Sequence, residues 1–128
     1  MIPAAIDQIL VGLITANFLN EMRFAQSFAR GKFRIKKWGR NRIKQELKVR
    51  DISSYCIKAG LKEIDPQEYL ETFHEISFKK GTSLEGLPLI QQRKKLADYL
   101  FYRGWESQLV YDKLQELPFQ EMDKPSKS

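Results

Sequence analysis

The sequence predicts an all-α protein in which tandem three-helix repeats form an elongated helical array. Apolar residues recur at helical spacing along the chain, as at Ile43 and Leu47 or at Leu96 and Leu100. No stretch alternates apolar and polar residues between hairpin turns, which a sheet would require. The chain also matches itself when one half is shifted onto the other, which is typical of repeat proteins.

Helix-capping residues and glycines place the expected boundaries. Asp65 fits an N-cap and Pro66 fits the first turn that follows. Gly104 fits the left-handed residue that ends a helix. Gly31 and Gly81 are expected to interrupt helices. We expect helices over residues 3–15, 20–35, 40–50, 54–64, 66–80, 89–103 and 107–117.

The internal match defines the units of the array. A shift of 53 residues places Ile43 on Leu96, and a shift of 45 places Phe24 on Tyr69. Each unit is stabilised by stacking on its neighbours, so the ends of an array are weak points. We expect a remnant third helix of a truncated first repeat (1–19) that packs on its neighbour, a basic three-helix repeat (20–64), a second repeat with a loop insertion near 81–88 (66–117) and a flexible tail (118–128).

Composition indicates a globular, intracellular protein. Of the 128 residues, 42% are hydrophobic, which is enough to bury a core. The single cysteine, Cys56, excludes a disulfide within the chain and fits a reducing compartment. The apolar segment 2–19 is interrupted by Asp7 and Gln8, so we interpret it as a packed helix rather than a signal peptide or membrane span. We expect a cytoplasmic monomer that makes no membrane contact.

The residue patterns of enzymes are missing from the sequence. His74 is the only histidine, so neither a catalytic triad nor a set of histidine metal ligands is available. Cys56 lies on an expected helix where a buried, unreactive thiol is favoured. The chain holds no phosphate-binding loop and no glycine-rich dinucleotide motif. We therefore expect no catalytic residues, no cofactor and no metal, which makes a binding protein the favoured class.

Positive charge is concentrated in one segment of the chain. The net charge is +6, and residues 23–50 contain eleven Lys or Arg residues against one acid, Glu46. The rest of the chain has eleven basic and fifteen acidic residues. Such an excess indicates a negatively charged partner, although a solvated helix face would show the same pattern.

Folding is expected to gather most of these charges into one exposed surface, which we call the basic ridge. It comprises Arg23, Arg30, Lys32, Arg34, Lys36, Lys37, Arg40, Lys44 and Lys48. Arg42 and Arg50 each lie four residues from Glu46, so we expect weak helical ion pairs there and rank both behind the ridge. Trp38 is a candidate for stacking on a base or a partner, and the alternative is that its ring covers the junction of two helices.

The same segment resembles the RecX family of recombination regulators. Arg23-Phe24-Ala25 followed by Phe28 is similar to the family's R-F-A-x-x-F-x-R helix start. Residues 38–52, with Trp38-Gly39-Arg40 at their start, resemble its G-x-x-R-I-x-x-E-L-x-x-[RK]-G-I pattern, with Asp51 in place of the usual glycine. Residues 100–105 resemble its L-x-x-R-G-[FY] element. The resemblance covers residues 2–117.

The resemblance implies a fold and a partner. RecX proteins have three tandem three-helix units, of which most of the first is missing here. They bind the RecA recombinase, lie in the groove of the RecA–DNA filament and limit its activity in DNA repair and recombination. The basic ridge would meet acidic protein or the phosphate backbone, with weak, salt-dependent DNA binding. There are two alternatives: a helix-turn-helix-like DNA-binding protein without a recombinase partner, and a protein-interaction array that does not contact nucleic acid. Only Lys58 and Lys62 on the expected helix 54–64 could read bases.

Overall fold

The structure is a computed structural model that describes residues 4–125. All of the regular elements in this range are helices, which confirms the all-α prediction. They are α1 (Ala4–Lys36), α2 (Arg40–Val49), α3 (Ser54–Leu61), α4 (Pro66–Ser83), α5 (Leu89–Tyr102), α6 (Ser107–Leu114) and the short 3-10 helix η1 (Glu121–Asp123).

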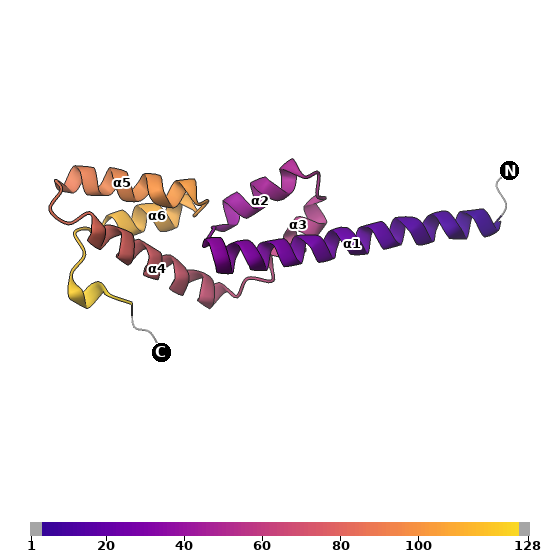
Figure 1. Ribbon diagram of the computed structural model, residues 1–128, viewed down its shortest axis with the longest axis horizontal. Coiled ribbons are helices and arrows are strands. Elements are labelled where there is room, and N and C mark those ends of the chain that lie inside the picture. The colour runs from indigo at the N-terminus through magenta and orange to yellow at the C-terminus, as the bar shows by residue number, and fades with distance from the viewer. Residues whose placement is uncertain (1–3, 126–128) are drawn as a thin grey trace.

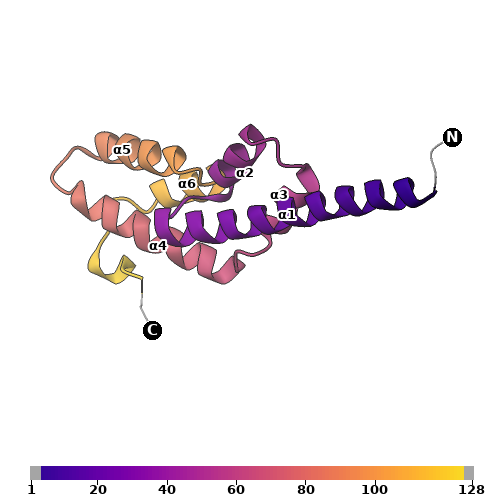
Figure 2. The ribbon, with the colours of Figure 1, turned by 45° about the vertical axis from the view of Figure 1, so that its right-hand side comes forward.

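The helices form an elongated molecule (Figure 1). The second half of α1 lies with α2 and α3 near the middle, whereas α4, α5 and α6 lie together at the end opposite the N-terminus. The turned view keeps the same grouping (Figure 2). The most extensive helix packing is between α1 and α3, followed by that between α5 and α6. How the chain divides into repeats remains a prediction, but the helices fall into two groups of three.

The expected break between helices 3–15 and 20–35 is wrong, because α1 continues through it. No Gly or Pro separates Thr15 from Asn20, and Gly31 costs the helix interior only about 1 kcal/mol relative to Ala. The N-terminal part also does not pack as a cap. Leu10 is 47% exposed and Ile14 is 68% exposed, and this half of α1 projects beyond the other helices (Figure 1). Residues 1–3 of the expected remnant lie outside the described residues.

Phe24 and Phe28 lie four residues apart, and this helical spacing predicts that both face the core, but the buried face of α1 is offset from them by one position. Phe24 is 45% exposed, whereas Ala25 and Ala29 are fully buried. The reason is the close approach of α3, since a Cβ on Gly60 would lie 2.7 Å from the carbonyl oxygen of Ala25. Small residues on both helices make this contact. The core continues without a break through both groups of helices, in residues that include Phe33, Ile43, Leu47, Ile57, Tyr69, Phe73, Leu96, Leu100, Trp105 and Val110.

Several expected helix ends are confirmed by the local geometry. The Asp65 carboxylate accepts a hydrogen bond from the backbone N–H of Glu68 at 2.9 Å, and Pro66 begins α4. Gly104 has φ +88° at the end of α5. Asp51, which takes the place of a glycine in the family pattern, has φ 59°. A residue in this left-handed conformation ends the helix before it, and Asp tolerates the conformation better than most residues.

Two expectations about the second half are wrong. Gly81 does not end a helix, because α4 runs to Ser83. The expected tail 118–128 is not free at its start, because Phe119 is buried and its ring stacks on Phe78 at 5.8 Å between centroids, whereas residues 120–124 are exposed. The two corrections share one cause. A Cβ on Gly81 would lie 2.3 Å from the Phe119 ring, so the glycine makes room for that ring within α4. Residues 126–128 lie outside the described residues.

Candidate partner-binding surface

The turn between α1 and α2 fixes the centre of the basic ridge. Lys37 has φ 59°, its N–H donates to Phe33 O at 3.0 Å, and the Trp38 N–H donates to Lys32 O at 3.3 Å. This is the bonding pattern of a helix C-terminus that closes through one left-handed residue, a position that usually holds Gly. The turn returns Trp38 towards α1 and leaves the side chains of Lys36 and Lys37 exposed.

The ring of Trp38 lies among cations and aromatic rings. The guanidinium of Arg42 is 4.2 Å from its centroid, the Lys32 ammonium is 5.0 Å away and the Phe28 ring is 6.3 Å away. Arg42 also donates to the carbonyl of Tyr102 at 3.1 Å. The tryptophan is half-buried in this arrangement. The geometry favours the interpretation that Trp38 covers the junction of two helices, and stacking on a partner stays a prediction.

Directly after Trp38, the backbones of the two helix groups meet. The Gly39 N–H donates to Arg103 O at 2.7 Å, and the Asn41 N–H donates to Gly104 O at 3.0 Å. A Cβ on Gly39 would lie 2.4 Å from Gly104 O, and one on Gly104 would lie 2.3 Å from Arg42 N. No side chain fits at either glycine without separating the backbones. The two glycine motifs of the sequence therefore form one joint.

A polar cluster beside this joint holds Arg40. The Tyr69 hydroxyl accepts from the Arg40 N–H at 2.9 Å and donates to the Glu106 carboxylate. The Arg40 guanidinium lies 3.9 Å from the Tyr69 ring centroid and 3.1 Å from a Glu106 oxygen. Burial, followed by the hydrogen bond to Glu106, raises the pKa of Tyr69 well above its usual range. Arg40 is thus engaged within the protein rather than open to a partner.

Two further ridge arginines also have internal partners. Arg30 pairs with Glu63, just after α3, and Arg34 Nε lies 3.8 Å from a Glu68 carboxylate oxygen on α4. The expected Glu46 pair forms with Arg50 at 2.9 Å, but Arg42 binds Trp38 and Tyr102 instead. Exposed ion pairs of this kind contribute about 0–1 kcal/mol each to stability, so an acidic group of a partner can replace the internal glutamate at little cost.

The remaining ridge residues, apart from Lys32, are exposed and form no ion pair within residues 4–125. They are Arg23, Lys36, Lys37, Lys44 and Lys48. The structure thus divides the predicted ridge into arginines that hold helices together and a mainly lysine set that faces solvent. Contact of this set with a partner stays a prediction.

Lysines outside the predicted ridge also lie close to it. Lys37 shares a surface cavity of about 380 Å³ with Lys79, Lys80 and Tyr99. The sequence prediction missed Lys79 and Lys80 because the chain outside residues 23–50 is acidic overall. The Lys79-Lys80 pair itself was the one signal that could have identified them, but it carries no information about a contact with Lys37.

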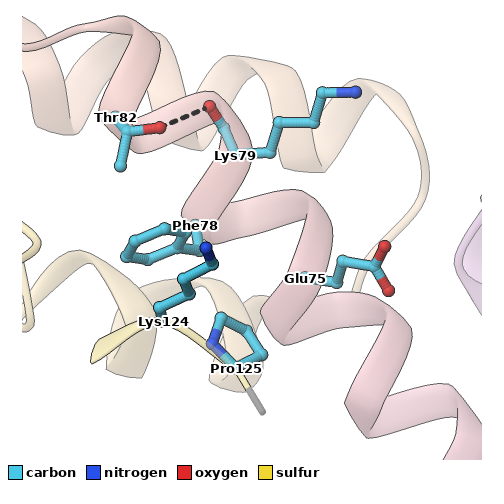
Figure 3. A pocket seen from close by; sticks show the side chains of 6 residues that line it. All are labelled: Glu75, Phe78, Lys79, Thr82, Lys124 and Pro125. Atoms are coloured by element: carbon cyan, nitrogen blue, oxygen red, sulfur yellow. Dashed lines mark hydrogen bonds between the residues drawn. The ribbon is translucent and has the colours of Figure 1, made fainter. Parts of the chain in front are cut away.

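A second hollow, of about 490 Å³, lies between α4 and the C-terminal segment and shares Glu75 and Lys79 with the first (Figure 3). Phe78, Lys124 and Pro125 form much of its wall, and the Thr82 hydroxyl at its rim donates to Lys79 O at 3.0 Å. Among residues 4–125, no three His, Cys, Asp or Glu side chains are grouped so that they could hold a metal ion. No helix in the described part of the chain is long and apolar enough to cross a membrane.

Comparison with known proteins identifies the family. A family model described as the second three-helix domain of RecX matches residues 20–61. A "Regulatory protein RecX" of Prosthecochloris aestuarii is 30% identical over 114 residues, which cover 88% of this chain and 72% of that relative. The chain belongs to the RecX family. Its relatives bear the name of regulatory proteins rather than of enzymes.

Other RecX relatives are matched over smaller shares of their length. The Streptococcus agalactiae serotype V protein is 30% identical over 112 residues, which are 88% of this chain but 43% of the relative. The Yersinia enterocolitica protein is 30% identical over 114 residues, covering 86% of this chain and 66% of the relative. No solved structure matches the chain.

Proposed function

We propose that this RecX family chain binds the RecA recombinase or the RecA–DNA filament and limits its activity in DNA repair and recombination, acting in the cytoplasm as a monomer. The observation that carries the proposal is the joint at Gly39 and Gly104, in a chain whose relatives are RecX regulatory proteins. Because the joint is made by backbone atoms in contact, it holds the two helix groups as one extended body. A rigid, elongated body of this kind can follow a filament groove.

The exposed lysines of α2 supply the charge that this proposal needs. Lys44 and Lys48 lie four residues apart, on the same side of α2 and away from the buried Ile43 and Leu47. Their ammonium groups form no ion pair within residues 4–125. Exposed and unpaired cations contribute mainly to the rate of association and to its salt dependence.

The experiment compares binding of the purified chain to RecA alone, to DNA alone and to preformed RecA filaments, at two salt concentrations. We expect the filament to bind more tightly than either component. The paired variant Lys44→Glu/Lys48→Glu should weaken filament binding while circular dichroism stays unchanged. Arg93→Glu/Lys94→Glu, at exposed residues of α5, changes the net charge equally and serves as the matched control.

The outcomes separate the proposal from its rivals. Binding to the filament that is no tighter than binding to bare DNA would contradict it and favour a plain DNA-binding protein. Binding to RecA that is indifferent to DNA and to salt would instead favour a protein-interaction array. Equal losses in the α2 pair and in its control would show that only net charge matters.

A further inference from the structure

We propose that the cavity between Lys37, α4 and α5 is a binding site for the phosphodiester backbone of nucleic acid. Three segments that are distant in sequence build it. Lys37 comes from the turn after α1, Lys79, Lys80 and Ser83 come from α4, and Tyr99 comes from α5. Because both helix groups contribute, the site exists only in the assembled array.

The cations at this site outnumber the acids. Lys80 Nζ lies 5.3 Å and the Arg103 guanidinium 3.9 Å from the Tyr99 ring centroid, so two positive groups surround this ring. Lys37 and Lys79 add two more at the wall of the cavity. Among the described residues that line the cavity, Glu75 is the only acid, against the three lysines. The lining therefore has a net excess of two positive charges, with Arg103 close behind Tyr99, and it attracts an anion unless salt screens it.

Lys37 carries a further indication of a role beyond the fold. The position has φ 59° and closes the α1 helix, where Gly is the residue that suffers no steric cost. A lysine there costs about 1 kcal/mol of backbone energy. The backbone N–H of Lys37 closes the helix by donating to Phe33 O, but its exposed side chain has no ion-pair partner within the described chain, so no side-chain pairing offsets that cost. Strain held at one residue of a charged cavity is typical of a binding site.

The arrangement favours a polyanion over a single carboxylate. Lys79 and Glu75 line both this cavity and the neighbouring hollow, whose wall includes Lys124 (Figure 3). Lys79 thus connects the cations of the two hollows, and a strand that repeats its charge every few ångströms can occupy several of them. Tyr99 is already contacted by Lys80 and Arg103, so it offers little free surface for base stacking. We therefore expect binding without sequence preference.

This inference deepens the proposed function, since a recombinase filament contains DNA, but its test omits the recombinase. The probes are a labelled single-stranded oligothymidine, a duplex of the same length, inorganic phosphate and polyglutamate as a competitor. The variants are Lys79→Glu/Lys80→Glu and Lys37→Asn, because Asn tolerates the left-handed conformation. Arg93→Glu/Lys94→Glu, at exposed residues of α5 that line neither hollow, is again the control of equal charge, and Lys79→Arg/Lys80→Arg keeps the charge.

We expect Lys79→Glu/Lys80→Glu to weaken oligonucleotide binding about tenfold or more at low salt and to lower the slope of log K against log salt by about two. Lys37→Asn should lower the slope by about one. The arginine variant should bind like the wild-type chain, and circular dichroism should be the same for all. Single-stranded and duplex DNA should both bind, and inorganic phosphate should compete only weakly, because it occupies one site at a time.

Three results would overturn the inference. The first is that the wild-type chain does not bind DNA in the absence of RecA, and the second is that Lys79→Glu/Lys80→Glu binds DNA as well as the control variant does. The third is that polyglutamate displaces the oligonucleotide as effectively as unlabelled DNA. The last result would assign the cavity to an acidic protein surface. If the chain binds the filament but these DNA-binding tests fail, the proposed function holds and the site is wrong. If the chain binds DNA at this site but does not bind the filament, the site holds and the proposed function is wrong.

Discussion

Replacement of Gly39 by alanine tests the joint on which the array depends. An added Cβ would lie 2.4 Å from Gly104 O and 2.7 Å from the Trp105 Cα, whereas ordinary van der Waals contact begins at 3.4 Å. The backbones must therefore separate by about 1 Å, because neither neighbour is a flexible side chain. Gly39 itself has φ −79° and ψ 171°, which alanine adopts freely, so the expected effect is steric.

The magnitude follows from the bonds that the separation breaks. The bonds from Gly39 N to Arg103 O and from Asn41 N to Gly104 O, now 2.7 and 3.0 Å, would exceed hydrogen-bond length. A buried polar group left without its partner costs about 1–3 kcal/mol. Alanine also restricts the unfolded chain, which raises the free energy of unfolding by about 0.4–1 kcal/mol and offsets part of this loss. We expect the free energy of unfolding to fall by about 2–4 kcal/mol.

The assay is urea unfolding followed by circular dichroism, with Gly31→Ala as control. Gly31 lies inside α1, and a Cβ there would meet nothing within 4 Å, so this variant should gain up to about 1 kcal/mol. For Gly39→Ala we expect a lower midpoint or two separate transitions, as the helix groups unfold independently. If both variants unfold at or above the wild-type midpoint, the two backbones are not in contact and the joint is wrongly assigned.

Three other predictions concern the rest of the fold. Leu47 is fully buried, so Leu47→Ala should cost about 2–5 kcal/mol by urea unfolding, while Ile35→Ala, at a side chain that is 78% exposed, should change stability by less than about 0.5 kcal/mol. Asp65→Ala removes the acceptor that caps α4 and should cost about 0.5–2 kcal/mol, whereas Asp65→Asn should retain most of the stability. Burial, and then the charge of Lys113, lower the pKa of His74 below its ordinary value of 6.5. The unfolded chain therefore binds the proton more readily, so stability should fall as pH drops below 6.5, and thermal unfolding of His74→Gln should lose this component.

The sequence could predict local features but not the contacts that join them. Helical spacing, the Asp65 cap and the left-handed Gly104 all depend on neighbours within four residues, and each was predicted. The continuity of α1 was missed because the repeat suggested a unit boundary where the chain contains no helix-breaking residue. The spacing of Phe24 from Phe28 predicts a core position for Phe24, whereas the buried face is set by how closely α3 can approach Ala25.

The candidate surface shows the same limit. The Arg50–Glu46 pair follows from a spacing of four residues and was expected. Arg30, Arg34 and Arg40 pair with Glu63, Glu68 and Glu106, which lie at least 33 residues away along the chain. Counting charge in a window cannot reveal such partners. It therefore overestimated how much of the ridge is available, and it missed the lysines of α4 that folding brings to Lys37.

There is a physical reason why the arginines of this surface make internal contacts while most of its lysines face solvent. A guanidinium forms several directed bonds and stacks on aromatic rings, so it suits internal contacts such as those of Arg40 with Tyr69 and Glu106. An ammonium is a compact, mobile charge that loses little by remaining in water until a partner arrives. The motifs around Gly39 and Gly104, which carry the family resemblance, are occupied in holding the array together. A match to these motifs therefore predicts the architecture, and we propose that the partner is selected by lysines at positions that the motifs leave open, such as Lys44 and Lys48, and by lysines outside the motifs.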